Sequence, residues 1–287
     1  MSAFAPGQTL AAAHEEIMDK LIINADDFGL TEGINNAVVE GYRRGVISST
    51  TLMATAPAAG HAARLAAENP GLGVGLHLNL TWGEPALPAG RVRSLVTGDG
   101  RFPGLAAAVA RLSTGWARAA ELAAELEAQA ERLRALGLSA THIDSHQHLH
   151  AHPRLRHVIA RVCPRLGITR MRGYRMQQVD GPKALAVRLA AALPAGSGSA
   201  AQMATPDRFF GIGTMGGKDF TPPLARALGG GKGTLEFMCH PGYADRELQE
   251  VSRYGAPRGS ELKVLLDPAF RKMLDASGAR LVSFAGL

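Results

Sequence analysis

The 287-residue chain is poor in cysteine, in aromatic residues and in long apolar runs. Its two cysteines, Cys163 and Cys239, lie far apart and form no C-x-x-C pattern. Their placement argues for a reducing compartment and against a disulfide scaffold or a thiolate metal site. Aromatic residues make up 5% of the chain, too few to form, together with the basic residues, the stacking platform that nucleic-acid binding requires. We therefore expect no nucleic-acid partner.

No apolar stretch approaches the roughly 20 residues that a membrane-spanning helix needs. Residues 1–20 lack a basic leader and contain Glu15, Glu16 and Asp19, so they do not look like a secretory signal. We expect a cytoplasmic protein with an N-terminal extension at residues 1–19, a frayed tail or short helix. Residues 20–287 are expected to form a single domain.

The net charge of +6 favours attraction to anions, whether lipid headgroups or an acidic substrate. Much of the excess lies between residues 154 and 175, where the sequence has Arg154, Arg156, Arg161, Arg165, Arg170, Arg172 and Arg175. A solvated helix face followed by a strand also explains such a cluster, and the sequence leaves both interpretations open.

Short apolar or β-branched runs alternate with helical patterns along the chain. The expected strands are 21–25, 46–55, 73–80, 141–150, 168–172, 234–240 and 280–284, and the expected helices are 31–44, 58–68, 116–136, 153–166, 182–193 and 260–276. Such alternation predicts an α/β fold with a parallel sheet. Polar residues on one face of several strands favour a distorted seven-stranded (β/α) barrel over an open sheet. In such barrels the chemistry lies at the carboxyl ends of the strands.

The stretch Thr141–His150 contains four histidines, and His142, Asp144, His146, His148 and His150 alternate with other side chains. In an extended strand this spacing presents a row of imidazoles and a carboxylate on one side. Histidine clusters of this kind are typical of metal sites. The alternative is an exposed strand end in which the histidines have no function.

Further metal-binding residues stand at the expected strand ends. Asp26 and Asp27 follow the first strand, and His77 lies in the third. Because adjacent aspartates cannot project identically, one can bind a metal while the other faces a water. Asp27, His77 and His146 would supply two imidazoles and one carboxylate and leave open positions, as catalytic metal sites do. An acidic helix cap and a buried core histidine are the ordinary alternatives.

Other polar residues complete the candidate site. His148 is a spare ligand or a substrate contact, and Asp144 and Asn79 are second-shell or substrate candidates, Asp144 because it can orient an imidazole. His240 ends the sixth strand and is a candidate proton donor, which requires a pKa near neutrality. Arg172 can pair with a catalytic carboxylate and hold it ionised, or can belong to the basic surface.

Two glycine-rich segments are interpreted as loops. The run Gly211–Gly216 matches G-x-G-x-x-G, but no apolar strand is predicted before it and no helix directly after it. We therefore interpret it as a mobile loop without a nucleotide site. The segment Ala195–Gln202, which contains Gly-Ser-Gly-Ser, is also expected to be a flexible loop.

Four segments carry a resemblance to a known family: Asn24–Gly29, Gly75–His77, Thr141–His148 and Met238–Pro241. They resemble the YdjC family of metal-dependent carbohydrate deacetylases, and their order spans nearly the whole chain. The resemblance implies a seven-stranded distorted barrel similar to that of polysaccharide deacetylases.

The resemblance also implies residue roles. Asp27, His77 and His146 become the ligands of a divalent ion, Asp26 the base and His240 the acid. Two imidazoles with a carboxylate suit Zn, Co, Ni or Mn better than Mg, but family members have been described with magnesium, so both Mg and Zn stay open. The implied substrate is an N-acetylated amino sugar.

The segment 242–262 resembles the branch of this family that is associated with hopanoid biosynthesis. That branch implies an N-acetylglucosaminyl hopanoid lipid as substrate and transient contact with the inner face of the membrane. The 154–175 arginines would attract the protein to the surface. Apolar residues of loops 80–105 and 195–220 would shelter the lipid end, namely Trp82, Leu87, Phe102, Met203, Phe209 and Phe210. The alternatives are a soluble chitooligosaccharide deacetylase, a metal-dependent phosphoesterase whose arginines clamp phosphate, and a non-catalytic sugar-binding relative. The sequence does not give the oligomeric state.

Overall fold

The computed structural model describes residues 19–175, 181–195, 203–216, 219–251 and 254–287. The predicted N-terminal tail and the predicted loop 195–202 therefore lie, apart from Asp19 and Ala195, outside the described residues. Among the described residues, no helix combines the length and the apolar character needed to cross a membrane.

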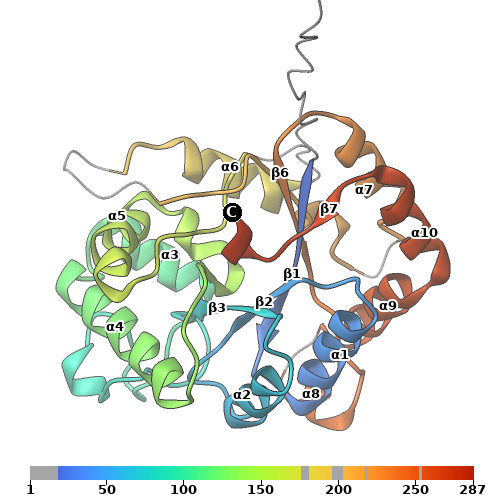
Figure 1. The fold of residues 1–287 in the computed structure, drawn as a ribbon. Coiled ribbons are helices and arrows are strands. Elements are labelled where there is room, and N and C mark those ends of the chain that lie inside the picture. The colour runs from blue at the N-terminus through green and yellow to red at the C-terminus, as the bar shows by residue number, and fades with distance from the viewer. Residues whose placement is uncertain (1–18, 176–180, 196–202, 217–218, 252–253) are drawn as a thin grey trace, which may run out of the picture.

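A parallel sheet forms the centre of the fold (Figure 1). Its strands are β1 (Lys20–Phe28), β2 (Ser49–Leu52), β3 (Gly73–Leu78), β4 (Ile143–Ser145), β5 (Arg208–Phe210), β6 (Thr234–Cys239) and β7 (Arg280–Leu281). The spatial order is β4-β3-β2-β1-β6-β5, and β7 pairs with the start of β1. Because every pairing is parallel, the strands end at one common edge. The predicted α/β class is confirmed, and the sheet curves as a half-barrel.

Helices connect the strands and cover the outside of the sheet (Figure 1). They are α1 (Glu32–Arg43), α2 (Ala59–Ala67), α3 (Leu105–Thr114), α4 (Ala119–Ala135), α5 (Pro153–Val162), α6 (Pro182–Ala192), α7 (Thr221–Gly229), α8 (Arg246–Val251), α9 (Gly255–Leu266) and α10 (Pro268–Ser277). Thr31 caps α1 as predicted, since its hydroxyl accepts from the Ile34 backbone N–H at 3.2 Å. The predicted helix 260–276 is instead α9 and α10, because Asp267 ends one helix and caps the next.

The alternation of β1 separates an apolar layer from a polar one. Leu21, Ile23 and Ala25 belong to the main apolar core, whereas Asn24 and Asp26 point to the opposite face of the strand. That second face is also polar on the neighbouring strands, where its residues include Thr51, His77, Asp144 and Glu236, all fully or almost fully buried. The predicted polar interior is therefore present.

The predicted strand 168–172 is wrong as a regular strand. Residues 170–172 make only isolated bridges, from Met171 to Ile143 of β4 and from Arg170 to Ala204. Arg172 N–H nevertheless donates to the Ile143 carbonyl at 3.1 Å, so this irregular segment lies beside β4. The seventh strand is β5, which the sequence did not predict. Its three residues are too few to show a strand period.

Candidate metal centre and its surroundings

The two aspartates at the end of β1 leave the backbone in different directions. Asp27 has a φ of 67°, a left-handed conformation that is uncommon outside glycine and clusters at functional sites. Asp26 stays on the polar face of the strand, while Asp27 departs from the alternation. The expectation that adjacent aspartates cannot project identically is confirmed, and this turn in the backbone is the reason.

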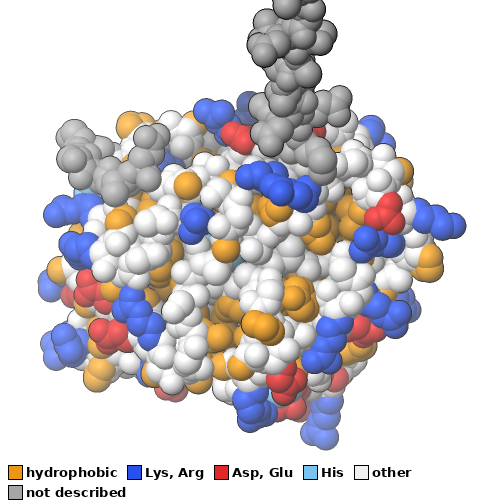
Figure 2. Space-filling model, in the orientation of Figure 1, with side chains coloured by type: hydrophobic (Ala, Val, Ile, Leu, Met, Phe, Trp, Pro, Cys, Tyr) orange, Lys and Arg blue, Asp and Glu red, His pale blue; other side chains and the backbone are white. Residues whose placement is uncertain are grey.

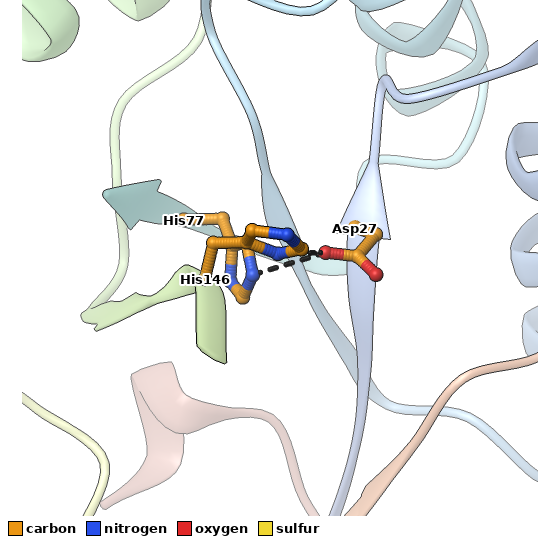
Figure 3. A group of neighbouring side chains, drawn as sticks. All are labelled: Asp27, His77 and His146. Carbon is orange, nitrogen blue, oxygen red and sulfur yellow. Dashed lines mark hydrogen bonds and ion pairs between the residues drawn. The ribbon is translucent and has the colours of Figure 1, made fainter. Parts of the chain in front are cut away.

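Asp27 brings two histidines together (Figure 3). Its Oδ1 lies 3.1 Å from His77 Nε2 at the end of β3 and 2.8 Å from His146 Nδ1, just after β4. These three donor atoms lie within 4.8 Å of one another. Two imidazole nitrogens and one carboxylate oxygen fit a divalent ion with positions left for other ligands. The residues predicted as metal ligands are thus gathered in one place.

The second ring nitrogen of His77, Nδ1, is hydrogen-bonded to residues on the side away from Asp27. Its Nδ1 lies 2.7 Å from Asp144 Oδ1 and 3.0 Å from the Thr51 hydroxyl. A carboxylate in this position is typical of metal-bound histidines, because it fixes the tautomer and leaves Nε2 for the ion. Burial lowers the pKa of His77, but Asp144 and the other carboxylates outweigh it and raise the pKa to about 10. A cation is therefore favoured here, whether a proton or a metal.

The predicted row of histidines is wrong beyond His146. Strand β4 ends at Ser145, and Gln147 and His148 have φ values of 60° and 61°. Alternation ceases at this turn, so His148 does not join the Asp27 cluster. It is buried edge-on against Phe209, with 6.0 Å between ring centroids, and burial lowers its pKa well below the usual value.

Asp26 is paired with Arg172, as predicted for a carboxylate that must stay ionised. Arg172 Nη1 donates to Asp26 Oδ2 at 2.8 Å, and Arg172 Nη2 donates to Asp26 Oδ1 at 2.6 Å. The same buried guanidinium lies 2.9 Å from Asp144 Oδ2 and 2.7 Å from Glu236 Oε1. Burial raises the pKa of Asp26, but Arg172 together with His77 and His240 outweighs burial and lowers the pKa to well below its usual range. Arg172 therefore belongs to the interior and not to a basic surface.

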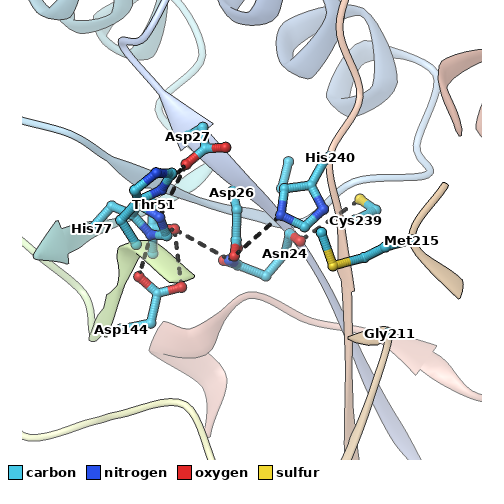
Figure 4. Close-up of polar contacts among 12 residues, drawn as sticks. Asn24, Asp26, Asp27, Thr51, His77, Asp144, Gly211, Met215, Cys239 and His240 are labelled. Carbon is cyan, nitrogen blue, oxygen red and sulfur yellow. Dashed lines mark hydrogen bonds and ion pairs between the residues drawn. The ribbon is translucent and has the colours of Figure 1, made fainter. Parts of the chain in front are cut away.

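His240 follows β6 and faces Asp26 (Figure 4). Its Nε2 lies 3.9 Å from Asp26 Oδ2, and its backbone N–H donates to Glu261 at 2.6 Å. Burial lowers the pKa of His240 to about 3, although Asp26 opposes the shift. His240 thus stands at the end of β6 beside Asp26, as expected of the predicted proton donor, but burial holds its pKa below the neutral value that was expected.

Arg258 was not predicted as a site residue. Its guanidinium binds Asp27 Oδ2 directly, and only 3% of the side chain is exposed. Because Arg258 engages Oδ2, Asp27 presents only Oδ1 to the histidines. The residue lies in α9, 231 positions after Asp27, and nothing local in the sequence distinguishes it from other helix arginines. A pairing partner at such a distance is visible only in the fold.

Asn79 orders a loop instead of the candidate site. Its Oδ1 accepts from the backbone N–H groups of Thr81 and Trp82 at 3.2 and 3.1 Å, and its Nδ2 donates to the Trp82 carbonyl at 2.6 Å. Gln129 binds its backbone on both sides. Its hydrogen bonds give no sign of the predicted second-shell role, and the side chain fixes the turn that follows β3.

The glycine run after β5 has a packing role. A strand does precede Gly211, contrary to the sequence interpretation, and a 3-10 turn, Ile212–Thr214, follows it. Gly211 has a φ of 137°, and a Cβ there would lie 2.4 Å from the Met238 carbonyl. The turn is buried at Ile212 and Thr214, so the first glycine allows close packing against β6. Residues 217–218 lie outside the described residues.

Fold and site together define an α/β half-barrel protein with a candidate catalytic metal centre at the carboxyl ends of its strands. Residues 20–276 match the family described as YdjC-like protein, and the chain belongs to this family. The branch associated with hopanoids is a narrower assignment that this match does not test.

Curated relatives match over nearly the full chain. A carbohydrate deacetylase of Geobacillus stearothermophilus is 38% identical over 92% of this chain and 96% of its own length. A chitooligosaccharide deacetylase of Yersinia enterocolitica is 34% identical over 93% and 99%. Among solved structures, a protein of Enterococcus faecalis provisionally described as a cellobiose-phosphate cleavage protein superposes with a TM-score of 0.77 at 26% identity, covering 94% of this chain and 98% of the other.

Proposed function

We propose that this chain is a carbohydrate deacetylase that uses a divalent metal ion to hydrolyse the acetamide of an N-acetylated amino sugar. The observation that carries the proposal is the convergence of Asp27, His77 and His146 beside a second, separately held pair, Asp26 and His240. The similarity to carbohydrate and chitooligosaccharide deacetylases over nearly the whole chain supports the same activity.

Asp27, His77 and His146 would hold the ion, which when bound would polarise the acetamide carbonyl and acidify a water. Asp26 accepts a proton from the attacking water. Arg172 keeps Asp26 ionised and in one orientation through two hydrogen bonds. Asp144 holds the His77 ring so that Nε2 faces the ligand position.

The same proton can then reach the leaving group. His240 Nε2 faces the Asp26 oxygen that Asn24 does not bind, and a ring with a low pKa gives up a proton readily. We infer that Asp26 passes the water proton to His240, and that His240 delivers it to the departing amine as the C–N bond breaks. Acetate and a free amino sugar are the products.

The metal is Zn or Mg in this proposal. The two imidazoles favour a borderline ion such as Zn, and the oxygen-rich surroundings (Asp26, Asp27 and Asp144) leave Mg open. Metal analysis of protein purified without chelator, followed by reconstitution of the metal-free protein, identifies the ion. Retention of full activity after complete removal of divalent ions would contradict the metal assignment.

Release of acetate from diacetylchitobiose, measured against release of phosphate from a panel of phosphoesters, tests the activity. We expect acetate only. Asp26→Asn should abolish turnover with the metal still bound, whereas His146→Ala should lose both. Phosphate release would favour the phosphoesterase, although Arg172 already binds three carboxyl groups and is a poor phosphate clamp. Neither product would indicate a sugar-binding relative.

The narrower proposal is a glycolipid substrate, an N-acetylglucosaminyl hopanoid, reached at the inner face of the membrane. Support comes from α6 and the residue that follows it: Leu185, Leu189 and Leu193 are spaced four residues apart and are 48%, 60% and 54% exposed. Residues 182–193 contain Lys183 and Arg188 and no acidic residue. An apolar face with basic neighbours suits an anionic lipid surface.

The prediction that apolar residues of loops 80–105 and 195–220 shelter the lipid end is wrong. Phe102, Met203, Phe209 and Phe210 are buried in the core, and Trp82 and Leu87 pack against it. The 154–175 arginines do not form one surface either. Arg172 is buried in the site, Arg156 binds backbone carbonyls and Arg165 pairs with Glu127. On the face drawn in Figure 2, basic side chains are scattered among acidic and apolar ones.

Sedimentation with anionic liposomes at low and high salt tests this contact. The wild type should bind at low salt, and the double variant Leu185→Glu, Leu189→Glu should not. Val109→Glu is the matched control, because Val109 is also exposed but lies on another helix, α3. Equal binding by both variants, or efficient turnover of diacetylchitobiose without any liposome binding, would rule out the membrane proposal.

A further inference from the structure

A column of buried side chains reaches Asp26 from the amino-terminal side of the sheet. Asn24, two residues earlier on the same face of β1, donates from Nδ2 to Asp26 Oδ1 at 2.9 Å. Asn24 Oδ1 lies 3.1 Å from His142 Nε2. The His142 ring stacks on Phe284, with 3.7 Å between centroids and 9° between planes. Asn24, His142 and Phe284 are all fully buried.

The ionised carboxylate of Asp26 fixes which group donates and which accepts in each hydrogen bond of this column. An ionised Asp26 can only accept, so the Asn24 amide nitrogen must face it and the amide oxygen must face His142. His142 Nε2 therefore carries the ring proton, and Nδ1 can only accept. The Thr141 hydroxyl must then give its single proton to Nδ1 at 2.8 Å and not to the Val74 carbonyl at 3.1 Å. Burial and Arg172 lower the pKa of His142, which agrees with a neutral ring that holds one proton.

The lower end of the column is fixed by packing. The Phe284 backbone N–H donates to the Ser49 hydroxyl at 3.0 Å, which ties Phe284 to the first residue of β2. Space for His142 comes from Gly75 of β3, where a Cβ would lie 2.5 Å from the His142 Cε1 atom. The His142 ring therefore stacks on Phe284, and the absence of a side chain at Gly75 leaves room for it.

We propose that His142, held by Phe284 and acting through Asn24, is a positioning residue for Asp26. The inference rests on the proposed function, in which Asp26 accepts the water proton. Arg172 binds both oxygens of Asp26, but it is shared with Asp144 and Glu236. The Asn24 amide supplies the remaining hydrogen bond to Oδ1 and leaves Oδ2 facing His240. A displaced base loses rate steeply, because catalysis depends on alignment at the ångström scale.

The test compares His142→Leu, which removes the donor to Asn24, with His142→Gln, whose amide can donate in its place. Turnover of diacetylchitobiose and metal affinity, from competition with a chromophoric chelator, are measured for each holoenzyme. We expect His142→Leu and Phe284→Leu each to lower kcat at least about tenfold, up to about a hundredfold, with KM and metal affinity unchanged. His142→Gln should recover most of the loss. The double variant His142→Leu, Phe284→Leu should be no slower than the slower single variant, because both act along one path.

Phe270→Leu is the matched control for lost packing. Phe270 is a fully buried phenylalanine in α10 that packs on Phe220, outside the column. It should lose thermal stability as Phe284→Leu does but keep its kcat. If the Phe284 and His142 variants keep their kcat as well, or lose metal affinity in parallel with kcat, the inference is overturned.

The Asp26→Asn variant separates this inference from the proposed function. An inactive Asp26→Asn enzyme beside fully active His142 and Phe284 variants refutes the positioning column alone. An active Asp26→Asn enzyme refutes the base assignment, and the positioning of Asp26 by His142 falls with it.

Discussion

Glu236 should make the free energy of unfolding fall as pH rises through the neutral range, the reverse of the usual effect of a buried carboxylate. The residue lies fully buried on β6, where Oε1 accepts from Arg172 at 2.7 Å and Oε2 has no partner among the described residues. Burial raises its pKa from 4.5 to about 8, more than Arg172 lowers it. At neutral pH the folded protein therefore holds a neutral carboxyl group at this position, whereas the unfolded chain holds a carboxylate.

The sign follows from the proton count. Between pH 4.5 and about 8 the folded state binds a proton that the unfolded state has released, so this contribution to the free energy of unfolding falls as pH rises. It is complete below pH 4.5 and lost above pH 8. The slope is about 1.4 kcal/mol for each pH unit, which gives up to about 4 kcal/mol between pH 5 and pH 8.

Glu236→Gln keeps the shape of the side chain and removes the titration. Urea unfolding of the wild type and the variant at pH 5, 6.5 and 8 measures the difference in free energy of unfolding. We expect the free energy of unfolding of the variant, relative to that of the wild type, to increase steadily as pH rises. Glu131→Gln, an exposed substitution on α4, is the control and should follow the wild type. A constant difference between Glu236→Gln and the wild type from pH 5 to pH 8 would refute the reasoning.

Three other results are expected. Arg172→Met leaves Asp26 and its neighbouring carboxylates buried without a cation, so it should cost about 3–5 kcal/mol of stability in urea unfolding and abolish acetate release; normal turnover would contradict the role given to the ion pair. Gly75→Ala sets a methyl group against the His142 ring and should cost about 1–3 kcal/mol, visible as a lower Tm. Chelation of the metal should lower the Tm in a way that added metal reverses, and His146→Ala should remove this dependence; an unchanged response in that variant would exclude His146 as a ligand.

The sequence predicted the strand-end residues well, for a physical reason. Apolar runs mark buried strands, parallel strands end at one edge, and a polar residue placed there must meet the others. The gathering of Asp27, His77 and His146 follows from these three facts. The pairing of Arg172 with a carboxylate was one of two alternatives, and the segment that carries it makes only isolated bridges.

The failures have physical causes as well. The histidine row was predicted from an extended chain, but positive φ values at Gln147 and His148 end the strand, and no local pattern announced them. Arg258 and Asn24 act through contacts that only the fold creates. The pKa of His240 depends on how deeply the ring is buried, which is a property of its neighbours and not of the residues beside it in sequence.

The pairing of strand β1 with β6 has a consequence for the order in which the candidate metal centre forms during folding. Lys20 pairs with Thr234 of β6 and Asn24 with Met238, so more than 200 residues separate one edge of β1 from its partner. Contacts across such separations form late, because the ends of a long loop must first meet. Until β6 and α9 dock, Asp26 and Asp27 have an open strand edge beside them, and Asp27 lacks Arg258. Tight binding of a metal ion would then indicate that folding is complete. Release of the ion would be an early sign that β6 has separated from β1.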